Sequence, residues 1–159
     1  MHVDDLHTPY LAIDLDRLEA NAAAMRDRCH ELGVRLRPHV KTTKCVEAAR
    51  IQLGGSHGPI TVATLPEARG FAVAGFTDVT YAVPTAPTTA RELCRLAGEL
   101  ERLRLDVDHP ATVDALDAVD RSRLFAVIAT SGTTNAGVID DLDGAADVSE
   151  ELGVWYHVD

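Results

Sequence analysis

This sequence contains almost no lysine, few aromatic residues and no long apolar run. Of its 15 basic residues, all are arginines except Lys41 and Lys44. The net charge of −10 argues against nucleic acid and anionic membrane surfaces as partners. No segment approaches the roughly 20 apolar residues of a membrane span, and the first residues lack a signal-peptide pattern. We therefore expect a cytoplasmic protein that binds no membrane.

Cysteine is also scarce. Cys29, Cys45 and Cys94 are odd in number and widely spaced, and they form no Cys-x-x-Cys motif. This usage is typical of reduced thiols and not of a disulfide framework. It agrees with a cytoplasmic location.

Short apolar runs alternate with segments of helical periodicity along the chain, which predicts an α/β protein with a parallel sheet covered by helices. The expected strands, adjacent and parallel in this order, cover 34–40, 60–64, 78–83 and 103–107. Two further strands, over 125–130 and 154–158, are expected to extend the sheet. Because a complete eight-unit barrel needs at least about 200 residues, a chain of 159 residues predicts a partial β/α barrel, with an open doubly wound sheet as the alternative.

Lys41 directly follows the strand expected over 34–40. In both candidate folds, ligands bind at the carboxyl ends of the parallel strands. Lysine can lose its proton and attack a carbonyl to form a Schiff base, whereas arginine cannot. We expect Lys44 to fall in the first turn of the next helix and to face solvent. The alternative for both lysines is a solvated surface position.

Three ordered blocks resemble one enzyme family: TPYLAIDLDRLEANAAAM, RLRPHVKTTKC and VATLPEARGFAVAGFTDVTYAVP. Residues 8–119 are similar to the N-terminal, alanine-racemase-like barrel of D-threonine aldolases and D-serine dehydratases, which use pyridoxal 5′-phosphate. The family motif Arg-Pro-His-x-Lys-Thr-His-Lys implies that Lys41 forms the Schiff base with this cofactor. The other matching residues are Arg37, Pro38, His39, Thr42 and Lys44. The chain has Thr43 where the family usually has histidine.

Arg37 and His39 alternate with Lys41 along the expected strand, so all three point to one face. Arg37 would help to release the Lys41 proton and would belong to the cofactor site. Its alternative role is a salt bridge within the barrel. His39 would hydrogen-bond the cofactor or relay a proton, and its alternative is that of a structural histidine.

The last segment, LFAVIATSGTTNAGVIDDLDGAADVSEELGVWYHVD, resembles a different family, the group II pyridoxal-phosphate-dependent decarboxylases. This resemblance covers residues 124–159. It implies that Thr134 contacts the cofactor and that Asp159 pairs with its pyridine nitrogen. We therefore expect two parts, an alanine-racemase-like half-barrel over 1–119 and a truncated decarboxylase-like β/α segment over 120–159.

The first resemblance implies a pyridoxal-phosphate-dependent lyase that acts on a small D-amino acid, by retro-aldol cleavage or by dehydration, with Lys41 as its catalytic residue. No His-x-Cys pair occurs among the seven histidines, so no metal site is expected. Because both resemblances stop short of the full length of their families, we expect a fragment with little activity. The alternatives are a fragment of an amino-acid decarboxylase, a non-catalytic cofactor-binding module and a truncated product without a function. Assembly as a homodimer is left open.

Overall fold

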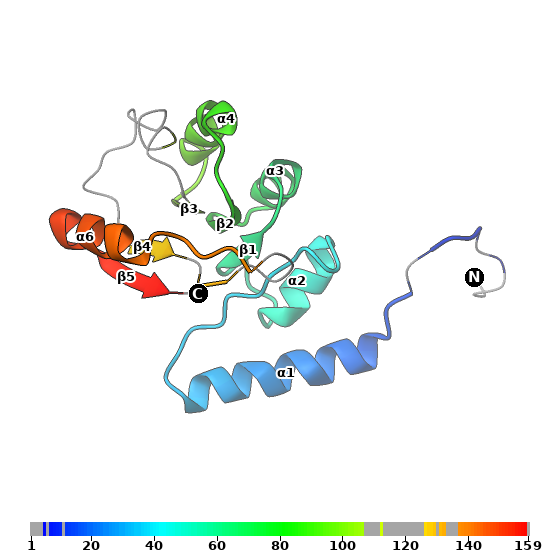
Figure 1. Cartoon of the computed structure of the whole chain (residues 1–159). Coiled ribbons are helices and arrows are strands. Elements are labelled where there is room, and N and C mark those ends of the chain that lie inside the picture. The colour runs from blue at the N-terminus through cyan, green and yellow to red at the C-terminus, as the bar shows by residue number, and fades with distance from the viewer. Residues whose placement is uncertain are drawn as a thin grey trace.

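The computed structural model describes residues 5, 7–10, 12–106, 112, 126–129, 131–132 and 137–158. Figure 1 shows the arrangement of the helices and strands, with α1 set apart from the sheets and packed beside α2. Their bounds, in chain order, are α1 Leu15–Glu31, α2 Val46–Gln52, β1 Ile60–Val62, α3 Leu65–Val73, β2 Asp78–Pro84, α4 Pro87–Ala97, β3 Arg102–Asp106, β4 Ala126–Ala129, α6 Leu142–Leu152 and β5 Trp155–Val158. None of the helices in the described ranges is long and apolar enough to cross a membrane.

Strands β1, β2 and β3 form a parallel sheet in this order. Ile60 of β1 aligns with Val79 of β2, and Val79 aligns with Leu103 of β3. The predicted adjacency and direction of these three strands are therefore confirmed.

The prediction of a strand over 34–40 is correct only at the end of that segment. His39 forms a parallel bridge with Thr61 of β1, whereas the residues before it make no ladder with any described segment. The Val40 N–H donates to the Thr61 carbonyl oxygen at 2.9 Å, and the Thr61 N–H donates to the Pro38 carbonyl oxygen at 2.9 Å. Because Pro38 has no N–H group, it cannot contribute a donor to a longer ladder.

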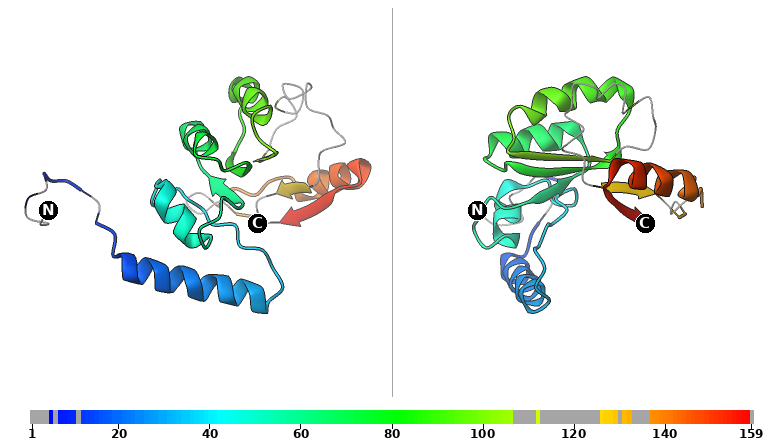
Figure 2. Two further views of the ribbon diagram at one scale, coloured as in Figure 1. Left: turned by 180° about the vertical axis from the view of Figure 1, so that it is seen from behind. Right: turned by 90° about the vertical axis from the view of Figure 1, so that its left-hand side faces the viewer.

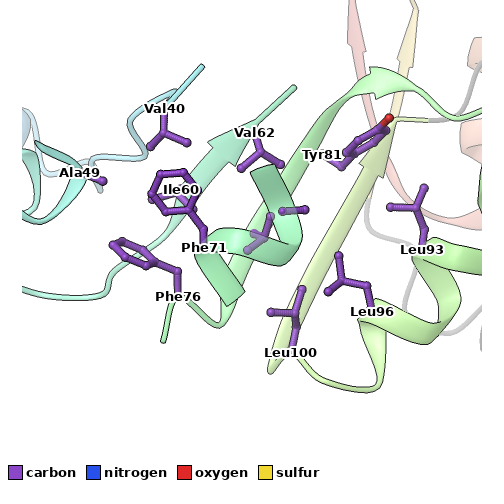
Figure 3. Packing of buried hydrophobic residues seen from close by; sticks show 12 residues of the cluster. Val40, Ala49, Ile60, Val62, Phe71, Phe76, Tyr81, Leu93, Leu96 and Leu100 are labelled. Atoms are coloured by element: carbon purple, nitrogen blue, oxygen red, sulfur yellow. The ribbon is translucent and has the colours of Figure 1, made fainter. Parts of the chain in front are cut away.

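Helices α3 and α4 cover one face of this sheet (Figure 2). Side chains alternate between the two faces of a strand, so Ile60 and Val62 are buried while Thr61 between them is only partly covered. Figure 3 shows Ile60 and Val62 beside Phe71 of α3, with Leu93 of α4 farther along the same cluster near Tyr81. The buried cluster comprises Val40, Ala49, Ile60, Val62, Ala68, Phe71, Phe76, Val79, Tyr81, Leu93, Leu96 and Leu100.

Strands β4 and β5 form a separate parallel pair and do not extend the first sheet within the described residues. The expectation that 125–130 and 154–158 would extend that sheet was therefore wrong. Helix α6 connects the two strands and packs against both, and the Tyr156 hydroxyl donates to the Leu142 carbonyl oxygen at 2.8 Å. In this β-α-β unit each strand pairs with the other along one edge.

Candidate active site

The turn formed by residues 40–44 lies at the carboxyl end of β1. Because His39 pairs with Thr61 in a parallel bridge, Lys41 comes level with Ala63, one residue beyond the end of β1. The Lys41 side chain is exposed and makes no hydrogen bond or ion pair with the residues that the structure describes. Lys41 thus lies at the carboxyl edge of the sheet, where the strand pattern predicted it.

His39 is joined directly to this turn. The Lys41 backbone N–H donates to Nδ1 of His39 at 3.2 Å. Since Nδ1 accepts this bond, the proton of the neutral ring is on Nε2. Partial burial lowers the pKa of His39, the charge of Lys41 lowers it further, and the Glu67 carboxylate opposes both effects. His39 is therefore a neutral hydrogen-bond donor beside Lys41 at neutral pH.

Lys44 does not occupy the first turn of α2, as was expected. Helix α2 begins at Val46 after the N-cap residue Cys45, and Lys44 precedes it with a φ of 49°, in the left-handed region. Its N–H donates to the Val40 carbonyl oxygen at 2.8 Å, which closes the turn. Its side chain is 61% exposed, as predicted for a lysine facing solvent, but Nζ lies 3.1 Å from Oε1 of Glu67.

Glu67 is the residue of this region that the sequence reasoning missed. Its side chain is only 7% exposed, and Oε2 accepts the Ala63 N–H at 2.9 Å. Burial would raise the pKa of Glu67, but the bond from Ala63 and the charge of Lys44 outweigh it, so the pKa is lowered. The signal that could have found it is the pattern Thr64-Leu65-Pro66-Glu67, since Ser/Thr followed three residues later by Glu marks a helix start.

An open pocket of about 360 Å³ lies next to the ion pair and is lined by Lys44, Thr64, Glu67 and Phe71 among others. It is bounded by Lys44 and not by Lys41. The two lysines therefore face different surroundings, as expected from their positions in the sequence.

The structure does not bring Arg37 to this turn. The Arg37 guanidinium lies 2.9 Å from Oδ1 of Asp78 and donates to the Ile60 carbonyl oxygen at 3.2 Å. Ile60 and Asp78 are the first residues of their strands, so Arg37 sits at the amino end of the sheet. Four residues of extended chain, about 13 Å, separate it from Lys41. Burial lowers the pKa of Arg37, although its hydrogen bond to Asp78 opposes this.

The remaining residues predicted for the site fall into two groups. Thr42 and Thr43 belong to the turn, and the Thr43 hydroxyl is buried without a hydrogen-bond partner among the described residues. Thr134 and Asp159 lie outside the described residues. The amine of Lys41 and the Nε2–H of His39 are therefore two polar groups of this segment without a hydrogen-bond partner among the described residues.

The parallel β/α repeats and the exposed lysine at the carboxyl end of a strand define a β/α-barrel protein of the kind that binds ligands at this edge. The family model described as alanine racemase, N-terminal domain, matches residues 13–134. The chain belongs to this family, and the predicted fold class, an incomplete alanine-racemase-like barrel, is confirmed.

Two relatives of known activity support this assignment. The D-threo-3-hydroxyaspartate dehydratase of Delftia sp. strain HT23 is 44% identical over 118 residues, which cover 74% of this chain and 31% of the dehydratase. The structure of the D-threonine aldolase from Filomicrobium marinum superposes with a TM-score of 0.73 at 26% identity, covering 98% of this chain and 44% of the aldolase. The chain therefore spans about a third of the dehydratase and less than half of the aldolase.

The resemblance of the last segment to group II decarboxylases is supported by a short match to one decarboxylase. The cysteine sulfinic acid decarboxylase of Mus musculus is 57% identical over 35 residues, which cover 22% of this chain and 7% of the decarboxylase. Both families noted in the sequence are thus represented among the relatives, and the alanine-racemase-like part accounts for most of the chain.

The alanine-racemase-like D-amino-acid dehydratases and aldolases are enzymes that depend on pyridoxal 5′-phosphate. The residues of the turn fit this group, because an exposed amine can bind its carbonyl covalently. The buried Thr43 hydroxyl and the Nε2–H of His39 are uncommitted polar atoms close to that amine in the sequence. The acceptors and charges of this polar cofactor need such partners.

Proposed function

We propose that this chain is the cofactor-binding part of a pyridoxal-phosphate-dependent lyase that acts on a small D-amino acid, by dehydration or by retro-aldol cleavage. Lys41 is the residue whose amine binds the cofactor. The observation that carries the proposal is the position of Lys41, an exposed amine at the carboxyl end of β1 in a chain of this family.

Each group of the turn has a separate task in this proposal. The bound cofactor supplies an electron sink for the bond that breaks at the substrate Cα. Lys41 would hold the cofactor through its amine, and the same amine, when free, would take a proton from the substrate. Nδ1 of His39 accepts the Lys41 N–H. The Nε2–H of the ring is therefore free to donate to the cofactor or to a departing group.

The roles of the other predicted residues are less well supported. For Arg37, the contacts with Asp78 and Ile60 favour the salt bridge within the barrel over contact with the cofactor. Thr134 and Asp159 stay predictions that rest on the decarboxylase resemblance. If that resemblance extends to function, they contact the cofactor ring from the second part of the chain.

We also propose that the chain consists of two parts, 1–119 and 120–159. The separate β4-α6-β5 unit supports this division, because its strands pair with each other. We expect the chain of 159 residues to turn over little substrate. An enzyme of this kind orients its cofactor through contacts spread over the whole barrel, and this chain spans 31% of the dehydratase.

The test is a labelling experiment with pyridoxal 5′-phosphate. The protein is mixed with the cofactor, reduced with borohydride and digested, and the modified lysine is identified by mass spectrometry. We expect the label on Lys41. The variant Lys41→Arg keeps the positive charge but cannot form the bond, so it should lose the label. Labelling of Lys44 alone, or equal labelling of both lysines, would contradict the assignment.

Turnover is measured on the same preparation. We expect no measurable ammonia from D-serine or D-threo-3-hydroxyaspartate and no glycine from D-threonine. Robust release of ammonia or glycine would contradict the expectation of little turnover. Release of carbon dioxide from an aromatic amino acid would instead favour the decarboxylase alternative, which the short match to a decarboxylase motivates.

A further inference from the structure

The turn 40–44, which carries Lys41, is anchored to β1 by its first residue, Val40. Val40 is 1% exposed, and its N–H donates to the Thr61 carbonyl oxygen of β1 at 2.9 Å. The last residue is different, because Lys44 has a φ of 49°. A residue with a Cβ atom in this region costs about 1–2 kcal/mol, which the surrounding structure must offset.

Two contacts hold Lys44 in this conformation, the hydrogen bond from its N–H to the Val40 carbonyl oxygen and the ion pair of Nζ with Glu67 at 3.1 Å. The Glu67 carboxylate is nearly buried, and its other oxygen accepts the Ala63 N–H at 2.9 Å. The Glu67 backbone N–H donates to Oγ1 of Thr64 at 3.3 Å. One residue therefore connects the end of the Lys41 turn, the end of β1 and the first turn of α3.

We propose that Glu67 is a positioning residue for Lys41, which acts by holding Lys44 and thereby fixing the turn 40–44. This inference rests on the proposed function, since it takes Lys41 as the residue that binds the cofactor. Glu67 does not touch the Lys41 amine. Its effect passes through the ion pair with Lys44 and the hydrogen bond that closes the turn on Val40.

Two features make this arrangement specific to Glu67. The partner of Lys44 is nearly buried, and a buried carboxylate loses little side-chain entropy when it forms a further contact. The Glu67 carboxylate also acts electrostatically on His39, which accepts the Lys41 N–H, because its charge opposes the lowering of the His39 pKa by burial and by Lys41. Loss of the Glu67 charge would therefore affect both Lys44 at the end of the turn and His39 before it.

Variants of Glu67, Lys44 and Glu47 distinguish an effect on the position of Lys41 from a general loss of stability. Glu67→Gln keeps the size of the side chain and an oxygen for the Ala63 N–H, but it removes the charge that holds Lys44. Lys44→Gly removes the ion pair and relieves the left-handed backbone at the same time. Lys44→Arg keeps the charge. The matched control is Glu47→Gln, because Glu47 is an exposed carboxylate of α2 whose recorded side-chain partner is Cys45 and not Lys44.

The first readout needs no cofactor. Since the chain has two lysines, ¹⁵N-lysine labelling gives two backbone amide signals, one for Lys41 and one for Lys44. We expect Glu67→Gln and Lys44→Gly to shift or broaden the Lys41 signal, while Glu47→Gln and Lys44→Arg leave it in place. A Lys41 signal that stays unchanged in folded Glu67→Gln and Lys44→Gly would overturn the proposal.

The second readout is the rate at which borohydride traps pyridoxal phosphate on Lys41. Loss of one ion pair to a buried charge is expected to slow this labelling about tenfold in Glu67→Gln and Lys44→Gly. Lys44→Arg and Glu47→Gln should stay within about twofold of the wild type, which is the range expected for changes at an exposed residue. Equal labelling of all variants, with the wild type labelled on Lys41, would refute positioning by Glu67.

The two proposals fail in distinguishable ways. An unlabelled wild-type Lys41 would refute the proposed function, whereas the amide signals would still decide whether Glu67 fixes the turn. Thermal unfolding shows which variants are folded. If Glu67→Gln does not fold, the comparison of Lys44→Gly with Lys44→Arg decides the question, because only the first of these variants loses the ion pair with Glu67 and glycine accepts the left-handed backbone.

Discussion

Replacing Asp78 by asparagine tests whether the charged cluster at the amino ends of the strands stabilises the half-barrel. The Asp78 carboxylate lies 2.9 Å from Arg37, 2.5 Å from Arg104 and 3.4 Å from Arg102. Asparagine keeps the shape of the side chain and removes its charge. Three guanidinium groups then lose the anion that they share.

The expected loss follows from the burial of these groups. The side chains of Asp78 and Arg104 are each 18% exposed and that of Arg37 is 24% exposed. A hydrogen bond to a charged group at such a site contributes about 1.5–3 kcal/mol. Arg102 is 54% exposed, and its contact adds less than about 1 kcal/mol. Because the asparagine oxygen retains part of these contacts, we expect the free energy of unfolding to fall by about 2–3 kcal/mol.

The assay is thermal unfolding followed by circular dichroism. For a chain of this size, the expected loss lowers Tm by roughly 5–10 °C. The matched control is Glu92→Gln, which also removes one negative charge. Glu92 lies 2.7 Å from Arg69, but the two side chains are 45% and 54% exposed, so we expect a loss of about 0.5 kcal/mol or less. Equal losses in the two variants would refute the reasoning.

The pH dependence gives an independent check on Asp78. Burial would raise the pKa of this carboxyl group, but Arg37 and Arg104 outweigh it and the pKa is lowered. A carboxyl group with a lowered pKa in the folded state contributes stability that is complete well above its unfolded pKa of about 3.9 and is lost as the pH falls through the folded pKa. The difference between wild type and Asp78→Asn should therefore be constant near neutral pH and shrink below about pH 4. A difference that grows on acidification would contradict this sign.

Two further predictions concern the core and a helix end. Phe76 is fully buried with its ring 5.3 Å from that of Phe71, so Phe76→Ala should lower the free energy of unfolding by about 3–5 kcal/mol in urea titrations. Val73→Ala, at a residue that is 91% exposed, should cost less than about 0.5 kcal/mol, and similar costs for both variants would exclude the assigned core. The Asp141 side chain caps α6 by accepting the Gly144 N–H at 3.0 Å, so Asp141→Ala should cost about 1 kcal/mol in the same titration, and an unchanged midpoint would argue against this cap.

Most of the fold could be predicted because its signals are local. The alternation of strands and helices, the Pro66 near the start of α3 and the position of Lys41 after a strand all depend on neighbouring residues. The predicted strand over 34–40 was too long, because alternating apolar and polar residues resemble a strand even where no neighbour pairs with them. The separation of β4 and β5 from the first sheet was missed for a related reason, since a strand's period does not identify its partner.

The candidate site was predictable in one respect and unpredictable in another. Lys41 was selected as a candidate because lysine is rare in this chain and because the surrounding motif resembles that of a family, and its assignment to the site stays a prediction. Glu67 was missed, although the pattern from Thr64 to Glu67 predicts a capped helix. That pattern says where α3 begins, but it does not say that the carboxylate would be buried or that Lys44 would reach it.

The sequence by itself determined the class of fold, the order of β1, β2 and β3, and the residue that presents an amine at their carboxyl edge. These properties follow from side-chain periodicity, from turn residues and from chemistry that only lysine can perform. The tertiary structure decided which charges meet. Arg37 pairs with Asp78 at the amino end of the sheet, 41 residues away, and Lys44 pairs with Glu67 at the carboxyl end. Such pairs depend on strand register and on burial, because a charged contact is strong only where packing has excluded water around it.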